Sequence, residues 1–182
     1  MYKKAALLFT ALLFAVAAHL RPCYDYELNG VRIASGIVPQ TAVFAEQAAQ
    51  DASEELLSGH AVLPSFRRHL RLRFSRASAD ARPLTDALLR ATEGIVLRDE
   101  VCVGGVRLGW VDDGQGLREA LSDYISNTLP VWASGGVLSR ELGIRRLYTR
   151  DGYLTPQGDM VLLITGAAPV FYYDQTGRYA RA

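Results

Sequence analysis

The chain has 182 residues, of which 49% are hydrophobic and 21% charged, with a formal net charge of +1. This composition excludes an intrinsically disordered protein, and the near-neutral charge provides no field that would attract nucleic acid. The length allows one medium domain or two small ones.

Residues 1–18 have the order of a secretory signal. Lys3 and Lys4 give a positive start, residues 5–18 form an apolar run, and residues 15–17 are small, as a signal peptidase requires. A cleaved signal peptide is the first interpretation and an uncleaved membrane anchor the second, because a spanning helix needs about 20 apolar residues. A buried core helix is the third interpretation. We expect an extracytoplasmic protein, secreted or attached to the cell envelope.

A β-hairpin and a helix are the first elements predicted after this segment. Residues 24–38 alternate in polarity and turn at Asn29-Gly30, a pair that strongly predicts a two-residue hairpin turn. A helix is predicted over residues 41–57, with Ser58-Gly59 ending it. Its apolar residues recur with helical spacing and are expected to face the core: Val43, Phe44, Ala48, Ala52 and Leu56.

A strand and a second helix come next. Over residues 66–74, leucine and phenylalanine alternate with arginine, which predicts a strand with Leu70, Leu72 and Phe74 inside and arginines outside. Pro83 begins a short helix predicted over residues 84–92.

The same series recurs roughly 75 residues later, which is typical of a duplicated unit. A hairpin is predicted around Gly104-Gly105, then a helix over residues 115–126 capped by Asp112 or Asp113, and a strand over residues 144–149. Shorter matches keep the same order: residues 134–138 resemble residues 58–63, and residues 154–166 resemble residues 84–94.

These patterns predict an α+β fold made of two tandem repeats of a small β-hairpin–helix–strand–helix unit. The repeats are expected at residues 24–95 and 98–168, after the N-terminal signal segment at residues 1–18 and before a strand-like tail at residues 169–182. Because a unit of this size has a small core, we expect the two to pack together or to share a sheet.

No catalytic or metal-binding signature is found. His60 and His69 lack metal-ligand spacing, and Ser58 and Ser134 lack the context of a hydrolase nucleophile. Asp112-Asp113-Gly114 begins like a calcium loop, but the later ligands are missing, so a helix cap is the better interpretation. No catalytic residue, metal or cofactor is predicted.

The best binding candidate is a row of arginines around the third strand. It could bind an anionic wall polymer or lipid headgroups, although a solvated strand face is the simpler alternative. Trp110 and Trp132 could form a carbohydrate platform or pack in a core. The row consists of Arg67, Arg68, Arg71, Arg73 and Arg76.

The chain contains two cysteines, Cys23 and Cys102, too few for a disulfide scaffold. Outside the cell they could form a disulfide with each other. A buried thiol at Cys102 and an incidental Cys23 are an equally good interpretation.

The hairpin and helix of the second round also resemble a known family. The pattern Gly-Val-Arg-x-Gly-x-Val-Asp-Asp at residues 105–113, followed by Leu-Arg-Glu-Ala-Leu at residues 117–121, is similar to the N-terminal extracytoplasmic region of Gram-positive cell-wall proteins with lysostaphin-type metallopeptidase domains. Leu154-Thr155-Pro156 matches a helix start in that region. The resemblance covers most of the chain after residue 18 and implies a non-catalytic module that faces the envelope.

Peptidase activity is not implied, because the chain ends before a peptidase domain and lacks its His-x-x-x-Asp and His-x-His zinc ligands. We therefore expect an exported binding or spacer module of the bacterial envelope. Its partner would be a cell-wall polymer or another envelope protein, with no nucleic acid, and with membrane contact only through an uncleaved N-terminal segment. The alternatives are a cell-wall hydrolase with a site assembled from scattered residues and a hydrolase regulator.

Overall fold

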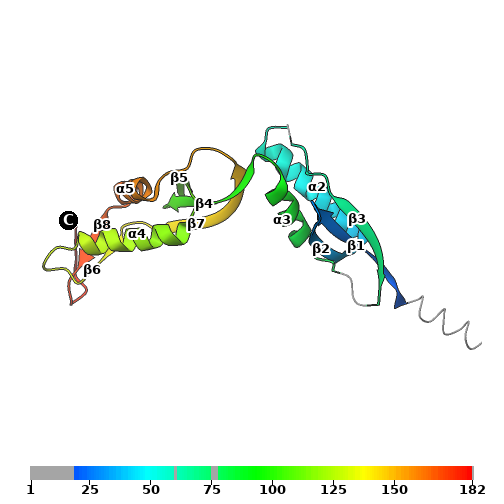
Figure 1. The fold of residues 1–182 in the computed structure, drawn as a ribbon. Helices are drawn as coiled ribbons and strands as arrows, with labels where there is room; N and C mark the ends of the chain where they lie inside the picture. The colour runs from blue at the N-terminus through cyan, green and yellow to red at the C-terminus, as the bar shows by residue number, and fades with distance from the viewer. Residues whose placement is uncertain (1–18, 60, 75–77, 182) are drawn as a thin grey trace, which may run out of the picture. The chain divides into compact units, whose positions relative to one another are not determined.

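The computed structural model describes residues 19–59, 61–74 and 78–181. The fold is mixed α+β, as expected, and divides into two compact units, Met1–Ile95 and Val96–Ala182. The predicted signal segment lies outside the described residues. Figure 1 shows the helices and small sheets of both units.

Unit 1 is built on a three-stranded antiparallel sheet with the order β2-β1-β3. Strands β1 (Arg21–Leu28) and β2 (Val31–Ile37) form the predicted hairpin. Its turn residues have positive φ angles, 50° at Asn29 and 81° at Gly30, which explains the Asn-Gly pair. Strand β3 (Arg67–Arg73) pairs with the other edge of β1.

Two helices complete unit 1, and the buried face of the first differs from the prediction. Helix α2 (Pro39–Leu56) begins at Pro39, and helix α3 (Arg82–Ala91) has Pro83 in its first turn. The two helices pack against each other, and the Thr85 hydroxyl donates a hydrogen bond to the Ala45 carbonyl at 3.3 Å. The buried residues of α2 are the small ones, Ala42, Ala45, Ala49 and Ser53.

The expectation that Val43 and Phe44 face the core was therefore wrong. They are 64% and 68% exposed. The close approach of α3 favours alanine on the shared face of α2 and leaves the larger side chains to solvent.

The expected apolar inner face of β3 was also wrong. Leu70, Leu72 and Phe74 are each more than 60% exposed. Helix α2 reaches the sheet at Tyr26 and Arg68, whereas Leu70 and Leu72 lie further along β3, opposite Tyr24 and Pro22 of β1. Alternation puts Leu70 and Leu72 on the same face of β3 as Arg68. No described helix covers the part of that face where the two leucines lie.

Unit 2 starts with the second predicted hairpin. Strands β4 (Ile95–Val103) and β5 (Val106–Val111) are joined by Gly104 and Gly105, both with positive φ. Helix α4 (Gly114–Asn127) follows, capped by Asp113. Strand β7 (Leu142–Arg150) completes a sheet with the order β5-β4-β7. In both units the first strand of the hairpin is thus the central strand of its sheet.

The core of unit 2 lies between this sheet and helices α4 and α5 (Gln157–Ala167). Its buried residues come from β4, β5 and both helices: Val101, Val103, Val111, Leu117, Leu121, Met160, Val161, Ile164 and Ala168. Leu117 and Leu121 of α4 are buried in this cluster, and Tyr124 and Ile125 of the same helix pack against it.

A second small sheet in unit 2 has the order β6-β8-β9. It consists of β6 (Gly135–Leu138), β8 (Val170–Tyr173) and β9 (Tyr179–Arg181), so the predicted strand-like tail pairs with β6 (Figure 1). Residues 134–138 were expected to resemble residues 58–63, which follow the end of α2, but α4 already ends at Asn127 and residues 135–138 form a strand. The described part of the earlier stretch, residues 58–59 and 61–63, contains no strand.

Candidate functional site

The outer face of the unit 1 sheet, away from α2, carries most of the arginines of that sheet. Residues paired directly across neighbouring strands share a face, and β1 pairs with β3 so that Cys23 lies opposite Arg71 and Asp25 opposite His69. Arg32 joins them from β2, opposite Glu27. The arginines of this arginine face are Arg21, Arg32, Arg67, Arg71 and Arg73, and they share it with His69 and the carboxylates Asp25 and Glu27.

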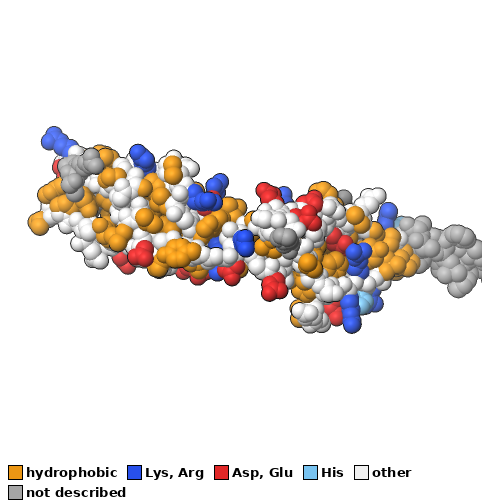
Figure 2. Space-filling view, turned by 90° about the horizontal axis from the view of Figure 1, so that it is seen from above, with side chains coloured by type: hydrophobic (Ala, Val, Ile, Leu, Met, Phe, Trp, Pro, Cys, Tyr) orange, Lys and Arg blue, Asp and Glu red, His pale blue; other side chains and the backbone are white. Residues whose placement is uncertain are grey.

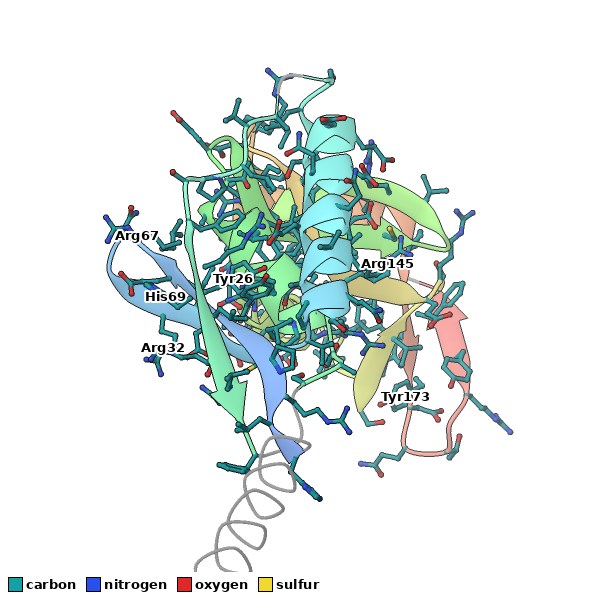
Figure 3. The ribbon with its side chains drawn as sticks, turned by 90° about the vertical axis from the view of Figure 1, so that its right-hand side faces the viewer. Tyr26, Arg32, Arg67, His69, Arg145 and Tyr173 are labelled. Atoms are coloured by element: carbon teal, nitrogen blue, oxygen red, sulfur yellow. The ribbon has the colours of Figure 1, made fainter. Side chains whose placement is uncertain are left out.

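Figure 3 shows how these side chains point. Arg32, Arg67 and His69 lie together on the side of the hairpin away from α2, whereas Tyr26 lies on the helix side. Tyr26 donates a hydrogen bond to Glu46 of α2, and burial and this bond raise the pKa of its phenol. The two faces of the sheet therefore differ: one contacts the helix and the other presents cations to solvent.

Asp25 is the centre of the arginine face. The residue is only 5% exposed, and its carboxylate accepts hydrogen bonds from the Gly36 backbone N–H at 2.9 Å and the Ser35 hydroxyl at 3.0 Å. Arg73 donates to both carboxylate oxygens, at 3.1 and 3.2 Å. Burial raises the pKa of Asp25, but the bonds from Gly36 and Ser35 and the charge of Arg73 outweigh it and hold the pKa below 3.8.

The predicted arginine row is only partly assembled. Arg67, Arg71 and Arg73 share the outer face, whereas Arg68 points to the helix side and forms an ion pair with Glu46 at 2.6 Å. Arg76 lies outside the described residues. Sequence reasoning missed Arg21 and Arg32, which join the face through strand pairing.

The cations of this face differ in how firmly they are held. Arg73 is bound to Asp25, Arg71 lies 3.9 Å from the same carboxylate, and His69 lies 3.5 Å from Glu27. No salt bridge within the described ranges uses Arg21, Arg32 or Arg67, all of which are exposed. These three guanidinium groups are therefore the ones most available to a ligand.

The buried carboxylates of unit 2 are also matched by arginines. Glu100 accepts a hydrogen bond from Arg145 at 2.7 Å, which raises the pKa of that guanidinium. Asp99 accepts from the Gly114 N–H at 2.8 Å and lies 3.7 Å from Arg146. Asp99 and Glu100 are consecutive in a strand and so point to opposite faces, an arrangement that does not form a carboxylate pair for acid–base work.

Asp112 and Asp113 have separate structural roles. Asp113 accepts hydrogen bonds at 3.0 Å from the N–H groups of Gln115 and Gly116, which confirms the predicted helix cap. Asp112 forms an ion pair with Arg98. Across the part of the chain that the structure describes, which omits His60, no group of three or more His, Cys, Asp or Glu side chains is arranged to hold a metal ion.

The two cysteines are not joined in the structure. Cys23 in β1 of unit 1 and Cys102 in β4 of unit 2 are both buried free thiols, and a disulfide between them stays a prediction. The Cys23 thiol donates a hydrogen bond to the Arg71 carbonyl at 3.6 Å, which links the two strands of the arginine face.

A second candidate site lies beside β5 in unit 2. One depression of about 750 Å³ is lined by β5, α5 and the segment between β7 and α5, and a neighbouring one of about 250 Å³ includes Arg98 and residues 149–154. Trp110 and Tyr153 line both depressions, whereas Trp132 lines neither, so the structure does not bring the two predicted tryptophans together.

Much apolar surface remains accessible in both units, as the orange side chains of Figure 2 show. No helix among the described residues is long and apolar enough to cross a membrane. No known family, curated protein or solved structure matches the chain.

Proposed function

We propose that the chain is an exported, non-catalytic module of the bacterial cell envelope that binds an anionic polymer through unit 1. The observation that carries the proposal is the arginine face, where five arginines and a histidine oppose two carboxylates. The character of residues 1–18 supports export, and the resemblance to wall-protein modules supports the location.

The chemistry of arginine fits such a polymer. A guanidinium binds phosphate or carboxylate oxygens through two parallel hydrogen bonds, and it keeps its charge at any physiological pH. Alternate residues of a strand lie about 7 Å apart, so β3 presents the guanidinium groups of Arg67, Arg71 and Arg73 at regular positions along one face, with the His69 ring between the first two. A polymer with a repeated anionic group could contact several of them at once, which adds avidity to weak single contacts.

We further propose that the two units arose by tandem duplication. Each contains a hairpin, a helix, a third strand beside the central one and a second helix. In each, a buried acid on the outer side of the central strand binds an arginine of the third strand: Asp25 with Arg73, and Glu100 with Arg145. In this proposal, the other arginines of the arginine face were acquired by unit 1 after the duplication.

The test is retention of the purified chain on isolated cell walls. The informative variant is Arg32→Glu/Arg67→Glu, because those residues are exposed and form no salt bridge with any residue that the structure describes. Changing Arg73 would instead leave the buried Asp25 carboxylate without its main cation. The matched control is Arg82→Glu/Arg178→Glu, which makes the same charge change on exposed residues elsewhere.

We expect the Arg32→Glu/Arg67→Glu chain to lose most retention and the control chain to keep it. Retention of the wild type should also fall as salt rises, because the Debye length shrinks from about 8 Å at 0.15 M salt to about 3 Å at 1 M. Equal retention of both variants would refute the role of the arginine face. Failure of the wild type to bind any wall preparation would refute the proposed function.

A further inference from the structure

We propose that the Trp110–Tyr153 groove of unit 2 is a binding site for a linear glycan, separate from the arginine face. The groove consists of the two neighbouring depressions that share these aromatic residues. Charged residues line both depressions: Arg107 and Asp159 the larger one, and Arg98, Arg150 and Asp151 the smaller one.

The backbone around both aromatic residues is held in place by a hydrogen bond and by two ion pairs. The Thr155 backbone N–H donates to the Trp110 carbonyl at 3.0 Å, which fixes the segment carrying Tyr153 along β5. Arg98 forms ion pairs with Asp112, two residues after Trp110, and with Asp151, two residues before Tyr153, the latter at 3.8 Å. A site whose side chains are already ordered loses less entropy when its ligand binds.

The absence of a side chain at Gly109 makes this arrangement possible. A Cβ at that position would lie 3.0 Å from the Thr155 hydroxyl and 3.1 Å from the Met160 methyl group. Gly109 therefore allows residues 153–155 to pack against the strand, and it also lines the floor of the larger depression.

The exposure of Tyr153 points to a ligand. Tyr153 is 83% exposed, so it presents a flat, amphipathic ring to solvent. Leu162 and Leu163, 60% and 47% exposed, extend the apolar surface into the larger depression. A sugar ring has C–H groups on its faces and hydroxyl groups around its edge, which matches aromatic rings bordered by Arg, Asp and Thr side chains.

Other ligand classes fit less well. Arginines are accompanied by Asp159 in one depression and Asp151 in the other, so the lining does not select a strongly anionic ligand. A peptide added as a strand would need the free edge of β5, but the Trp110 carbonyl on that strand already accepts a hydrogen bond from Thr155. Because the two depressions adjoin at Trp110 and Tyr153, the ligand is a chain of sugars that occupies both.

The test uses the fluorescence of Trp110. The chain has two tryptophans, so Trp132→Phe leaves Trp110 as the only indole. This full-length variant would be titrated with N-acetylglucosamine, chitohexaose, cellohexaose and peptide-free wall glycan strands. We expect saturable changes in emission with at least one hexamer or with the wall strands, and an affinity about tenfold or more above that of the monosaccharide, a difference of about 1.4 kcal/mol.

Tyr153→Ala in the same background should weaken binding about tenfold, a difference of about 1.4 kcal/mol, because the aromatic surface that contacts the sugar is lost. Tyr179→Ala, which removes a tyrosine 66% exposed outside the groove, should leave the affinity unchanged. No emission change with any glycan, or equal affinity in the Tyr153→Ala variant, would overturn the proposal. An emission change only with apolar peptides would overturn it in favour of a protein partner.

This site does not depend on the arginine face. The Arg32→Glu/Arg67→Glu variant should bind neutral oligosaccharides as the wild type does, even if it no longer binds an anionic polymer. The two proposals can therefore fail separately.

Discussion

Replacement of Asp25 is the sharpest test of the electrostatics of unit 1. In Asp25→Ala, the Gly36 N–H, the Ser35 hydroxyl and Arg73 all lose their acceptor. Gly36 is buried, so its N–H is left without a partner, which costs about 1–3 kcal/mol. The Ser35 and Arg73 side chains reach solvent, and that of Arg73 is 37% exposed. Both can bind water in the variant, so the loss of their acceptor contributes less to the destabilisation.

We therefore expect Asp25→Ala to lower the free energy of unfolding by about 2–3 kcal/mol. Asp25→Asn keeps an oxygen that can accept from Gly36 and loses only the charge, so its cost should be closer to about 1 kcal/mol. Urea unfolding followed by far-UV circular dichroism would measure both. Both tryptophans lie in unit 2, so tryptophan emission provides an internal control for that unit.

The stability of unit 1 should depend on pH, and the pKa of Asp25 fixes the direction. Because the pKa of Asp25 is lower in the folded chain than its ordinary 3.8, the ionised carboxylate contributes stability above pH 3.8, and this contribution is lost as the pH falls through the folded-state pKa. Wild-type stability should thus decline below about pH 4, and this component should be missing in Asp25→Asn. An Asp25→Ala chain within about 0.5 kcal/mol of wild type would show that the carboxylate contributes no net stability.

Two further predictions concern single polar groups in helices, both measured by urea unfolding. Asp113→Ala should destabilise unit 2 by about 1 kcal/mol because α4 loses its cap, whereas Asp112→Ala removes only a largely exposed ion pair and should cost less; the reverse order would contradict the assignment of the cap. Ser53→Ala should leave unit 1 equally stable or stabilise it by up to about 1 kcal/mol, because the Ser53 hydroxyl is buried without a hydrogen-bond partner; a loss of more than about 1 kcal/mol would show that the hydroxyl has a stabilising role.

Local signals predicted the elements of this fold well. Asn29-Gly30 and Gly104-Gly105 adopt the positive φ angles that a tight hairpin requires, and Asp113 caps the helix that follows it. Each of these depends on interactions among residues close together in the chain, so the residue types alone carry the information. The alternation of β3 likewise predicted a strand with Arg71 and Arg73 on one face.

The partners of those faces depended on residues far away in the chain. Alternation gives a strand two faces but does not say which part of a face a helix covers, so the exposure of Leu70 and Leu72 could not be predicted. The exposure of Val43 and Phe44 could not be predicted either. Alanines occupy the buried side of α2 because α3 packs there.

The sequence by itself thus determined the hairpin turns, the cap of α4 and most of the strands and helices, because neighbouring residues decide them. The tertiary structure decided the candidate sites. Asp25 and Arg73 are 48 residues apart, and Trp110 and Tyr153 come from separate segments. Strand register and packing bring such residues together, and these result from the balance of contacts over a whole unit.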